Sequence, residues 1–367
     1  MDMRPDIENI ISQFRISGEL VSCKECRTGH INSTFFATFR EGGAESKYVL
    51  QKINTYVFNN PEQLMSNIVG VTGYLRRVIA KEGGDPERGT LNFIACHNGQ
   101  YFCRDHDGGC WRMYKYIDNV VSYQLAESTD LFREVGFAFG DFQRKLAGYD
   151  ARSLYETIPD FHNTKKRYSD FERAVAGCAG ERREIAAYEI DFVRQRREKC
   201  SVIVDEIAAG RLPVRVTHND TKLNNILIDK DTGRAVCIID LDTVMPGSAL
   251  YDFGDAIRFG ASSALEDEAD LDKVYFRSDM YEAFAEGFIR GAGGALTRHE
   301  ISLLPTGAYI ITLETGMRFL ADYLEGDVYF RTEYEDHNLI RARNQLKLVY
   351  DIETRFGEFV RITERFA

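Results

Sequence analysis

Short strand-like runs of apolar residues mark the first third of the chain. They cover residues 34–39, 48–50, 90–95 and 100–104, and a further run at 111–117 leads into a connector. Between the second and third runs, residues 61–81 have the length and spacing of a helix. The pattern predicts a small lobe of mixed strands and helix over residues 1–115.

The remainder of the chain is predicted to be largely helical. Two sets of apolar residues recur at helical spacing, and each set should face a core. They are Leu131, Val135, Phe139, Phe142 and Leu146, and then Ile310, Leu313, Met317, Leu320 and Leu324. Residues 181–209 form a long, charged segment of helical character. We therefore expect an α+β fold with a larger, mainly helical lobe over residues 116–367.

Composition excludes several classes of protein. The chain has 367 residues, of which 44% are hydrophobic, enough for about two domains with real cores. Its formal net charge of −11 argues against a nucleic-acid-binding surface, which needs clustered Lys and Arg. The polar N-terminus has no apolar signal segment, and no run of about 18 apolar residues predicts a membrane span. We therefore expect a cytoplasmic protein whose eight cysteines are reduced thiols.

Polar residues with a fixed spacing lie at 216–225. His218, Asp220 and Asn225 form the pattern His-x-Asp-x-x-x-x-Asn, and the following strand-like run ends in a further aspartate, Asp240. This is the arrangement of a kinase catalytic loop followed by a metal-binding strand. Asp220 is placed to orient an acceptor hydroxyl and accept its proton. Asn225 and Asp240 supply the oxygen ligands that Mg²⁺ prefers, so the pattern predicts phosphoryl transfer from a magnesium-bound nucleotide.

Asp and Asn in loops also cap turns, which is the simpler alternative for each of these residues taken alone. Here, however, the elements follow one another in order. An apolar run at 213–216 leads into the loop, a second at 225–228 leaves it, and an Asp-Thr-Gly turn within 229–233 precedes a third at 235–239. Such a hairpin would bring Asp240 back beside Asn225. This order favours the kinase interpretation.

Asp252-Phe253-Gly254 spells the protein-kinase metal motif literally. It follows a turn at residues 245–248 and leads into a short helical segment, so we expect Asp252 to cap that helix. Asp240 is the better metal ligand, because it ends the run that follows the catalytic loop. Asp242 would share a strand face with Asp240 if the strand continued, either as a second ligand or as a supporting group.

These motifs in this order resemble the aminoglycoside phosphotransferase and choline kinase group, which has a bilobal protein kinase-like fold. A closer resemblance, to the N-acetylhexosamine 1-kinase family, runs across nearly the whole chain. It is carried by residues 28–32, 48–51, 111–115, 217–227 and 316–327. That family uses ATP and Mg²⁺ to phosphorylate the anomeric hydroxyl of N-acetylglucosamine or N-acetylgalactosamine. The loop alone identifies only the superfamily, whereas residues 317–327 favour the sugar-kinase subgroup.

The resemblance implies that residues 1–115 bind the nucleotide. The contacts would come from Asn32, from Gln51 and from a hinge that holds adenine through its backbone, formed by Tyr114, Lys115, Tyr116 and Ile117. Where a protein kinase carries a strand lysine, Gln51 and Lys52 stand here, and strand alternation lets only one of them face the phosphates. Gln51 matches the sugar-kinase family. Residues 28–32 contain one glycine, which is a weak phosphate-cradling signal by itself.

Residues 116–367 would then carry catalysis and sugar binding, with Asp220 as the base. Lys222 would neutralise charge on the transferred phosphoryl group; a solvated surface lysine is the alternative. His30 and Arg318 would approach the sugar or the transferring phosphate. Tyr329 would stack on the sugar ring, and a structured loop without that role is the alternative.

Arg318 has two interpretations. Glu314, Arg318 and Asp322 recur every four residues, which predicts a ladder of ion pairs on an exposed helical face. The resemblance favours instead an arginine on a buried polar face that clamps an anion or a sugar hydroxyl.

The leading interpretation is an ATP- and Mg²⁺-dependent N-acetylhexosamine 1-kinase. One alternative is a phosphotransferase acting on another small hydroxyl acceptor, such as a different sugar, a choline-like amino alcohol or an aminoglycoside. A second is a non-catalytic pseudokinase. The expected partners are a small-molecule sugar and a nucleotide, with no nucleic acid and no membrane. The sequence does not decide between the gluco and galacto epimers, the preferred nucleotide or the oligomeric state.

Overall fold

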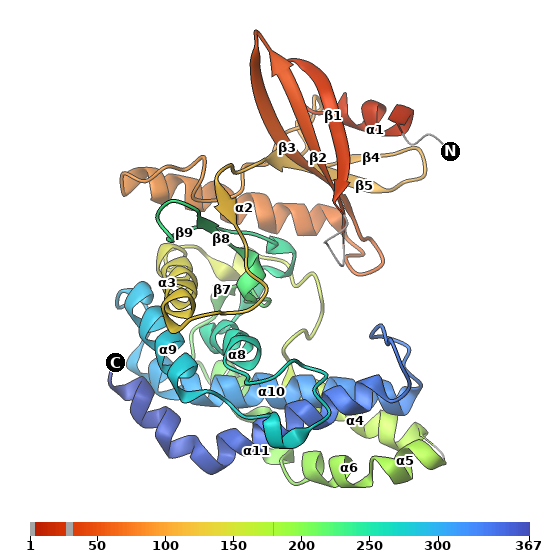
Figure 1. The fold of residues 1–367 in the computed structure, drawn as a ribbon, viewed down its shortest axis with the longest axis vertical. Helices are drawn as coiled ribbons and strands as arrows, with labels where there is room; N and C mark the ends of the chain where they lie inside the picture. The colour runs from red at the N-terminus through yellow and green to blue at the C-terminus, as the bar shows by residue number, and fades with distance from the viewer. Residues whose placement is uncertain (1–3, 27–31, 179) are drawn as a thin grey trace. The chain divides into compact units, whose positions relative to one another are not determined.

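A computed structural model of the chain describes residues 4–26, 32–178 and 180–367 (Figure 1). Contacts divide the chain into two compact units, and neither is one continuous segment. The first unit comprises residues 1–121, 153–159 and 227–244, and the second comprises 122–152, 160–226 and 245–367. The predicted lobe boundary at residue 115 lies shortly before the chain first leaves the first unit.

The first unit is built on a five-stranded antiparallel sheet in the order β1-β2-β3-β5-β4. Its strands are β1 (Glu19–Cys26), β2 (Ser33–Glu41), β3 (Ala44–Ile53), β4 (Cys103–Arg104) and β5 (Cys110–Lys115). Helix α1 (Arg4–Ile11) packs its apolar side on this sheet, where Ile10 and Ile11 join a buried cluster with Phe35, Leu50 and Met113. The cluster forms the core of the unit and fixes β5, on which part of the candidate site depends.

Helix α2 (Pro61–Lys81) has the predicted bounds. Asn60 caps it by accepting a hydrogen bond from the backbone N–H of Gln63, and Pro61 occupies the first helical position, where its missing N–H costs nothing. Three shorter strands complete the sheets of this part of the chain. They are β6 (Val120–Val121), β8 (Ile226–Asp229) and β9 (Ala235–Ile238), which pair in the order β6-β8-β9.

Other expectations for the secondary structure were only partly correct. Residues 90–95 are not a strand; they reach β5 through one bridge, Phe93–Tyr114, and a few backbone hydrogen bonds. The predicted strand at 100–104 shrinks to β4. Strand β1 was not predicted, because its buried and exposed positions do not alternate regularly. The helical segment 181–209 breaks into α5 (Glu181–Ile185), α6 (Ala187–Arg194) and α7 (Val202–Ala208).

The second unit is mainly helical, as predicted. Its longer helices are α3 (Thr129–Lys145), α4 (Thr164–Gly177), α8 (Ala249–Gly260), α9 (Ser278–Ala292), α10 (Arg298–Glu325) and α11 (His337–Glu364). Strand β7 (Arg215–Thr217) pairs with β10 (Met245–Gly247). Helix α10 starts with a capping box between Thr297 and Glu300 and packs against α4, α8 and α11 (Figure 1). In the described part of the chain, no helix has the length and apolarity required to cross a membrane.

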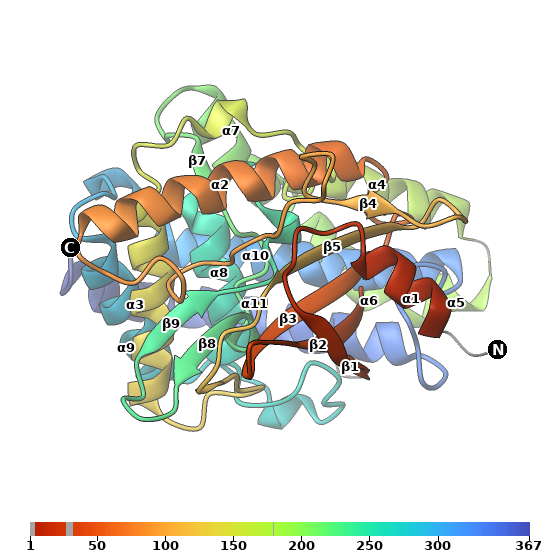
Figure 2. The same cartoon turned by 90° about the horizontal axis from the view of Figure 1, so that it is seen from above.

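Helices α3 and α9 lie side by side in both views (Figures 1 and 2). Four glycines line their contact. A Cβ atom on Gly136 or Gly140 would lie 2.4 or 2.1 Å from a backbone oxygen of α9, and one on Gly287 or Gly291 would lie 2.0 or 2.2 Å from a backbone oxygen of α3. The two backbones approach so closely that only glycine fits. The apolar spacing of α3 predicted a buried face but not this contact.

We expect Gly140→Ala to lower the free energy of unfolding. The new methyl group would collide with the carbonyl oxygen of Phe288, which belongs to backbone and cannot rotate away. Overpacking of this kind costs roughly 1–3 kcal/mol. The matched control is Gly177→Ala in α4, where an added Cβ meets nothing within 4 Å. Chemical denaturation should show a loss for the first variant and none for the second; equal stability of both would contradict the close-contact account.

Candidate active site

The predicted catalytic loop leaves β7 and runs through residues 218–222 in the second unit. Asp252, in the first turn of α8, accepts hydrogen bonds from the backbone N–H groups of His218 and Asn219 at 3.1 and 2.8 Å. The side chain of Gln143 donates to the same carboxylate at 2.8 Å and to the carbonyl of Val216 at 3.0 Å. Asn219 adopts φ +63°, a left-handed conformation that Asn tolerates better than most residues. The carboxylate of Asp252 therefore holds the start of the loop in place.

This arrangement corrects the expectation that Asp252 caps a helix. Helix α8 begins at Ala249, and its cap is Ser248, whose hydroxyl accepts from the backbone N–H of Leu250 at 3.3 Å. Asp252 lies inside the first turn and is fully buried. Burial raises the pKa of its carboxyl group, and the hydrogen bonds from the loop oppose that rise. Its partners are loop amides 33 and 34 residues earlier, which no local pattern reveals.

Three predicted residues meet around Asp220. The side-chain amide of Asn225 donates to the backbone oxygen of Asp220 at 2.8 Å and to its carboxylate at 3.1 Å. The ammonium group of Lys222 lies 2.9 Å from the other carboxylate oxygen. Burial lowers the pKa of Lys222, but Asp220 and Asp255 outweigh it and hold the pKa above its ordinary value. The group therefore stays charged beside the predicted base.

Asn225 also has an oxygen to offer. Because its amide nitrogen is committed to Asp220, the carbonyl oxygen is the atom of this side chain that fits a magnesium ion. Its position in the short 3₁₀ turn Leu223–Asn225 is fixed by the same bonds. The donor chemistry at Asn225 thus fits the predicted metal.

Two further groups support the loop. His218 is buried, its Nδ1 accepts from the backbone N–H of Asp220 at 3.2 Å, and its ring packs edge-on against Phe139 and Phe142. This fits a supporting histidine better than a proton carrier. Asp255 accepts from the backbone N–H of Thr221 at 2.9 Å and pairs with Arg258 at 3.1 Å.

The hairpin that precedes Asp240 is confirmed in the first unit. The backbone N–H of Gly233 donates to Asp229 at 2.9 Å, and that of Asp229 donates to Arg234 at 2.9 Å. Gly233 has φ +67°, the conformation for which the turn needs glycine. Asp240 follows β9 with φ +57° and starts a 3₁₀ turn, Leu241–Thr243. The chain therefore turns at Asp240, and the strand does not continue to Asp242.

Asp242 is buried and forms an ion pair with Arg112 of β5 in which both carboxylate oxygens take part. The side-chain amide of Asn32 donates to the same carboxylate at 2.7 Å. Burial lowers the pKa of Arg112, and the charge and hydrogen bonds of Asp242 more than restore it, so the pKa lies above its ordinary value. Three donors already occupy Asp242, which favours the supporting role over that of a second metal ligand.

Sequence reasoning missed Arg112. Its guanidinium also donates to the side-chain oxygen of Gln51, the residue paired with it across β3 and β5, from Nε at 3.0 Å and from a terminal nitrogen at 2.8 Å. Lys52 points elsewhere, to Asp105 at 2.9 Å and over the ring of Trp111. The positively charged side chain that binds Asp242, in the turn after Asp240, is therefore Arg112 of β5. The sequence did contain a signal for it, because Arg112 is a charged residue between the apolar residues Trp111 and Met113 of a strand.

Asn32 and two hinge residues, which are predicted to contact the nucleotide, form hydrogen bonds with other residues of the first unit. Asn32 uses its side-chain oxygen to accept from the backbone N–H of Asn54 at 2.9 Å, so both ends of its amide are engaged. In the hinge, the backbone N–H groups of Lys115 and Tyr116 donate to Asn92 and Lys47 at 2.9 and 3.0 Å. Adenine would have to use other backbone groups of residues 114–117. His30 lies outside the described residues.

Arg318 is not part of an exposed ion-pair ladder. Glu314 and Asp322 are both buried, and each bonds to other groups. The guanidinium carbon of Arg318 lies 5.4 to 5.9 Å from the ring centres of three aromatic residues, Phe161, Tyr329 and Phe330. Burial and the nearby Arg167 lower its pKa, and Glu314 only partly opposes this. In the parts of the chain that the structure describes, Arg318 has no carboxylate within ion-pairing distance.

The loop after α10 is held by Asp322. Its carboxylate accepts from the backbone N–H groups of Val328, Tyr329 and Phe330 at 3.0, 2.7 and 2.9 Å, and from the side chain of Asn338 at 2.8 Å. These bonds place the rings of Tyr329 and Phe330 beside Arg318, while Tyr329 keeps 69% of its surface exposed. Tyr329 therefore presents an exposed ring beside Arg318.

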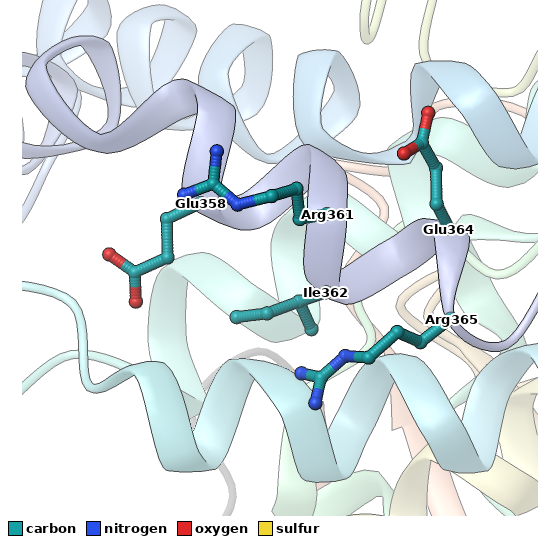
Figure 3. Close-up of a pocket in the computed structure, with 5 residues that line it drawn as sticks. All are labelled: Glu358, Arg361, Ile362, Glu364 and Arg365. Atoms are coloured by element: carbon teal, nitrogen blue, oxygen red, sulfur yellow. The ribbon is translucent and has the colours of Figure 1, made fainter.

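A pocket of about 540 Å³ lies along the last turns of α11 (Figure 3). Its walls are Glu358, Arg361, Ile362, Glu364 and Arg365, and Arg365 pairs with Glu282 of α9 at 3.0 Å. It contains none of the predicted catalytic or binding residues. We do not consider it part of the active site.

Solved structures of other proteins share this fold at low sequence identity. An aminoglycoside phosphotransferase from Alicyclobacillus acidocaldarius has a TM-score of 0.61 at 11% identity, over 98% of this chain and 96% of its own. Choline kinase from Cryptosporidium parvum has a TM-score of 0.59 at 13% identity, over 100% of this chain and 99% of its own. A spectinomycin phosphotransferase in complex with ADP and spectinomycin has a TM-score of 0.54 at 12% identity, over 95% of this chain and 98% of its own. They show the fold, which is bilobal and protein kinase-like, as predicted.

We expect Arg112→Met to destabilise the protein by roughly 3–5 kcal/mol, because it leaves the carboxylate of Asp242 buried without its cation. Adding Asp242→Asn in the same chain should recover part of this loss, since the lone charge is removed as well. Chemical denaturation of the two single variants and the double variant gives the coupling energy. Additive losses would show that the pair does not act as a unit.

A sequence model of a family matches residues 22–301, which is most of the chain. The matched range contains most of β1, the other strands of the first unit, the catalytic loop and Asp240. Arg318 and Tyr329 lie beyond its end, so the match concerns the phosphoryl-transfer machinery and leaves the acceptor open. The chain belongs to the phosphotransferase enzyme family.

Proposed function

We propose that this phosphotransferase moves the γ-phosphate of ATP to the anomeric hydroxyl of an N-acetylhexosamine, N-acetylglucosamine or N-acetylgalactosamine, giving the sugar 1-phosphate. The family membership supports the reaction type, and the surroundings of Arg318 are the observation that supports the acceptor class. His30 and Tyr329 are the further residues that we propose on the sugar side.

Catalysis requires positioning more than covalent chemistry. Asp220 orients the acceptor hydroxyl for in-line attack and accepts its proton, and Asn225 holds the carboxylate in that orientation. Lys222 carries a positive charge beside the base and is the group we propose to face the transferred phosphoryl. The proposed magnesium ligands are Asn225 and Asp240. Bound Mg²⁺ would neutralise charge on the nucleotide phosphates.

On the nucleotide side, the proposed contacts come from the hinge residues 114–117, from Asn32 and from Gln51. The contacts of Asn32 and Gln51 with Asp242 and Arg112 support an indirect contribution, through the turn that follows Asp240. A carboxylate with a fixed backbone beside it is a better metal ligand than one on a mobile turn.

The charge around Arg318 argues against a cationic acceptor. Choline and aminoglycosides carry positive charge, and a guanidinium without a carboxylate partner in the described residues would repel them. A neutral sugar has hydroxyl and carbonyl oxygens that accept from such a group. A phosphotransferase for a cationic acceptor would be expected to carry surplus carboxylates here. We find instead that Glu314, Asp255 and Asp322 are each engaged by other partners.

The proposal is tested by measuring ATP turnover over a panel of acceptors that includes both N-acetylhexosamines, their non-acetylated analogues, choline and an aminoglycoside. We expect product with the N-acetylhexosamines and a sugar 1-phosphate on analysis. Asp220→Asn should keep the fold and ATP binding and lose turnover by roughly 10²- to 10⁴-fold, as expected for a general base. Transfer to choline or an aminoglycoside, with none to any hexosamine, would overturn the acceptor assignment.

We expect Arg318→Met to separate stability from activity. Removing a partly buried cation without a partner should leave the melting temperature unchanged or raise it. The KM for the sugar should rise at least tenfold, which corresponds to about 1.4 kcal/mol, while the KM for ATP stays the same. The matched control is Arg196→Met, which breaks a paired arginine on Glu353 at 2.5 Å and should lower the melting temperature without changing either KM. Identical behaviour of the two variants would contradict this role of Arg318.

A further inference from the structure

His162 and Glu314 form a buried pair in the second unit. The Nδ1 atom of His162 lies 2.8 Å from one carboxylate oxygen of Glu314, and only 8% of the His162 side chain is exposed. The other oxygen of Glu314 accepts from the hydroxyl of Thr164 at 2.7 Å. Burial raises the pKa of Glu314, but His162, Thr164 and Arg318 outweigh it and hold the pKa below its ordinary value. Glu314 is therefore an ionised carboxylate with both oxygens engaged.

This pair fixes the tautomer of the imidazole. An ionised carboxylate only accepts hydrogen bonds, so Nδ1 of His162 carries the hydrogen. In the neutral ring, Nε2 then presents a lone pair. That atom is buried and has no hydrogen-bond partner in the described residues. Buried polar atoms are nearly always partnered, and leaving one without a partner costs about 1–3 kcal/mol.

The surroundings of His162 connect it to the acceptor side. Its ring packs against Phe161 at 4.6 Å and Tyr251 at 5.0 Å between ring centres. Phe161 is also one of the three rings around Arg318, and Glu314 precedes Arg318 by one turn of α10. On the other side, Tyr251 belongs to α8, the helix whose Asp252 and Asp255 accept hydrogen bonds from the backbone of the catalytic loop. His162 therefore lies among groups that belong either to the loop or to the proposed sugar site.

We propose that His162 is a specificity-determining residue whose Nε2 accepts a hydrogen bond from an O–H or N–H group of the acceptor. Glu314 is the positioning residue that fixes the ring and its tautomer, and Thr164 completes its hydrogen bonds. This inference rests on the proposed function, because it names a contact of the same acceptor. It adds a hydrogen-bond acceptor to a site in which Arg318 and Lys222 only donate.

Two substitutions separate a ligand contact from a structural role. His162→Asn keeps an amide N–H near the position of Nδ1, so the bond to Glu314 persists, but it has no atom at the position of Nε2. His162→Gln reaches the position of Nε2 and cannot bond Glu314 in the same way. We expect the Asn variant to raise the KM of the sugar at least tenfold. Its melting temperature should fall only by what the lost ring contacts with Phe161 and Tyr251 cost. The Gln variant should bind the sugar better than the Asn variant and melt at a lower temperature.

A substrate series identifies the contact. Each hydroxyl of the best acceptor is replaced by hydrogen in turn, and an acetamido group, where present, by an ester. One analogue should lose at least tenfold in kcat/KM with the wild-type enzyme and lose almost nothing further in His162→Asn. Unchanged KM values in His162→Asn, together with full penalties for every analogue, would overturn the proposal and leave His162 as the structural partner of Glu314.

An independent readout uses the wild-type protein. In the free protein, nitrogen-15 NMR should show Nε2 of His162 as a nitrogen that carries no hydrogen and makes no hydrogen bond. After saturation with the acceptor substrate, the same resonance should move to the position of a hydrogen-bonded nitrogen. A resonance that does not move would contradict the proposal even if a variant failed to fold. His299→Asn is the matched histidine control, since His299 pairs with Glu206 at the surface and should leave all values unchanged.

These experiments use whichever acceptor turns over best in the panel. If that acceptor is not a hexosamine, the proposed function fails, yet the Asn and Gln variants still test Nε2 against the acceptor found. If a hexosamine is phosphorylated and its KM ignores His162, only the present inference fails.

Discussion

Burying a charged side chain is unfavourable unless opposite charge and hydrogen bonds replace water, and the candidate site is organised by this constraint. Its backbone is irregular, and buried carboxylates hold it where no helix or strand does. Asp252 and Asp255 hold the catalytic loop, and Asp322 holds the loop that carries Tyr329. Asp242 lies in the turn after Asp240 and fixes it by binding Arg112 and Asn32. Each carboxylate needs donors, and the backbone amides that bind Asp252, Asp255 and Asp322 thereby acquire defined positions.

The same constraint explains why the loop needs so little regular structure. Within residues 218–222, the backbone of Asn219 adopts a left-handed conformation, which does not occur inside a regular β-strand or α-helix. The hydrogen bonds that the loop amides donate to Asp252, together with the packing of His218 on α3, offset this local cost. Asp220 is therefore fixed by partners on α3 and α8, and a substitution far from the reacting atoms in sequence can still displace it.

Sequence patterns predicted those parts of the fold whose causes are local. The helix 61–81 has its cap, its proline and its apolar spacing within one segment, and the hairpin at 229–233 has its glycine in the turn. Pairings between distant residues had no such signal. Arg112 and Asp242 are 130 residues apart, and only the pairing of β3 with β5 reveals that Gln51 joins them. Helical spacing alone suggested that Glu314 and Asp322 pair with Arg318, whereas the folded chain offers each a partner outside the helix.

Two polar groups near the proposed acceptor site differ from these carboxylates, because part of their bonding capacity is not used by the described residues. Within the described residues, Arg318 has no carboxylate partner and Nε2 of His162 has no hydrogen-bond partner. A guanidinium can only donate, and a neutral imidazole with its hydrogen on Nδ1 can only accept at Nε2. A ligand that satisfies both must therefore present a hydrogen-bond acceptor and a donor. The trimethylammonium group of choline presents neither, whereas the acetamido group of an N-acetylhexosamine carries a carbonyl oxygen and an N–H on adjacent atoms. Sugar hydroxyls also donate and accept, so the complementary deficits of Arg318 and His162 match a polar, uncharged acceptor such as the sugar proposed above.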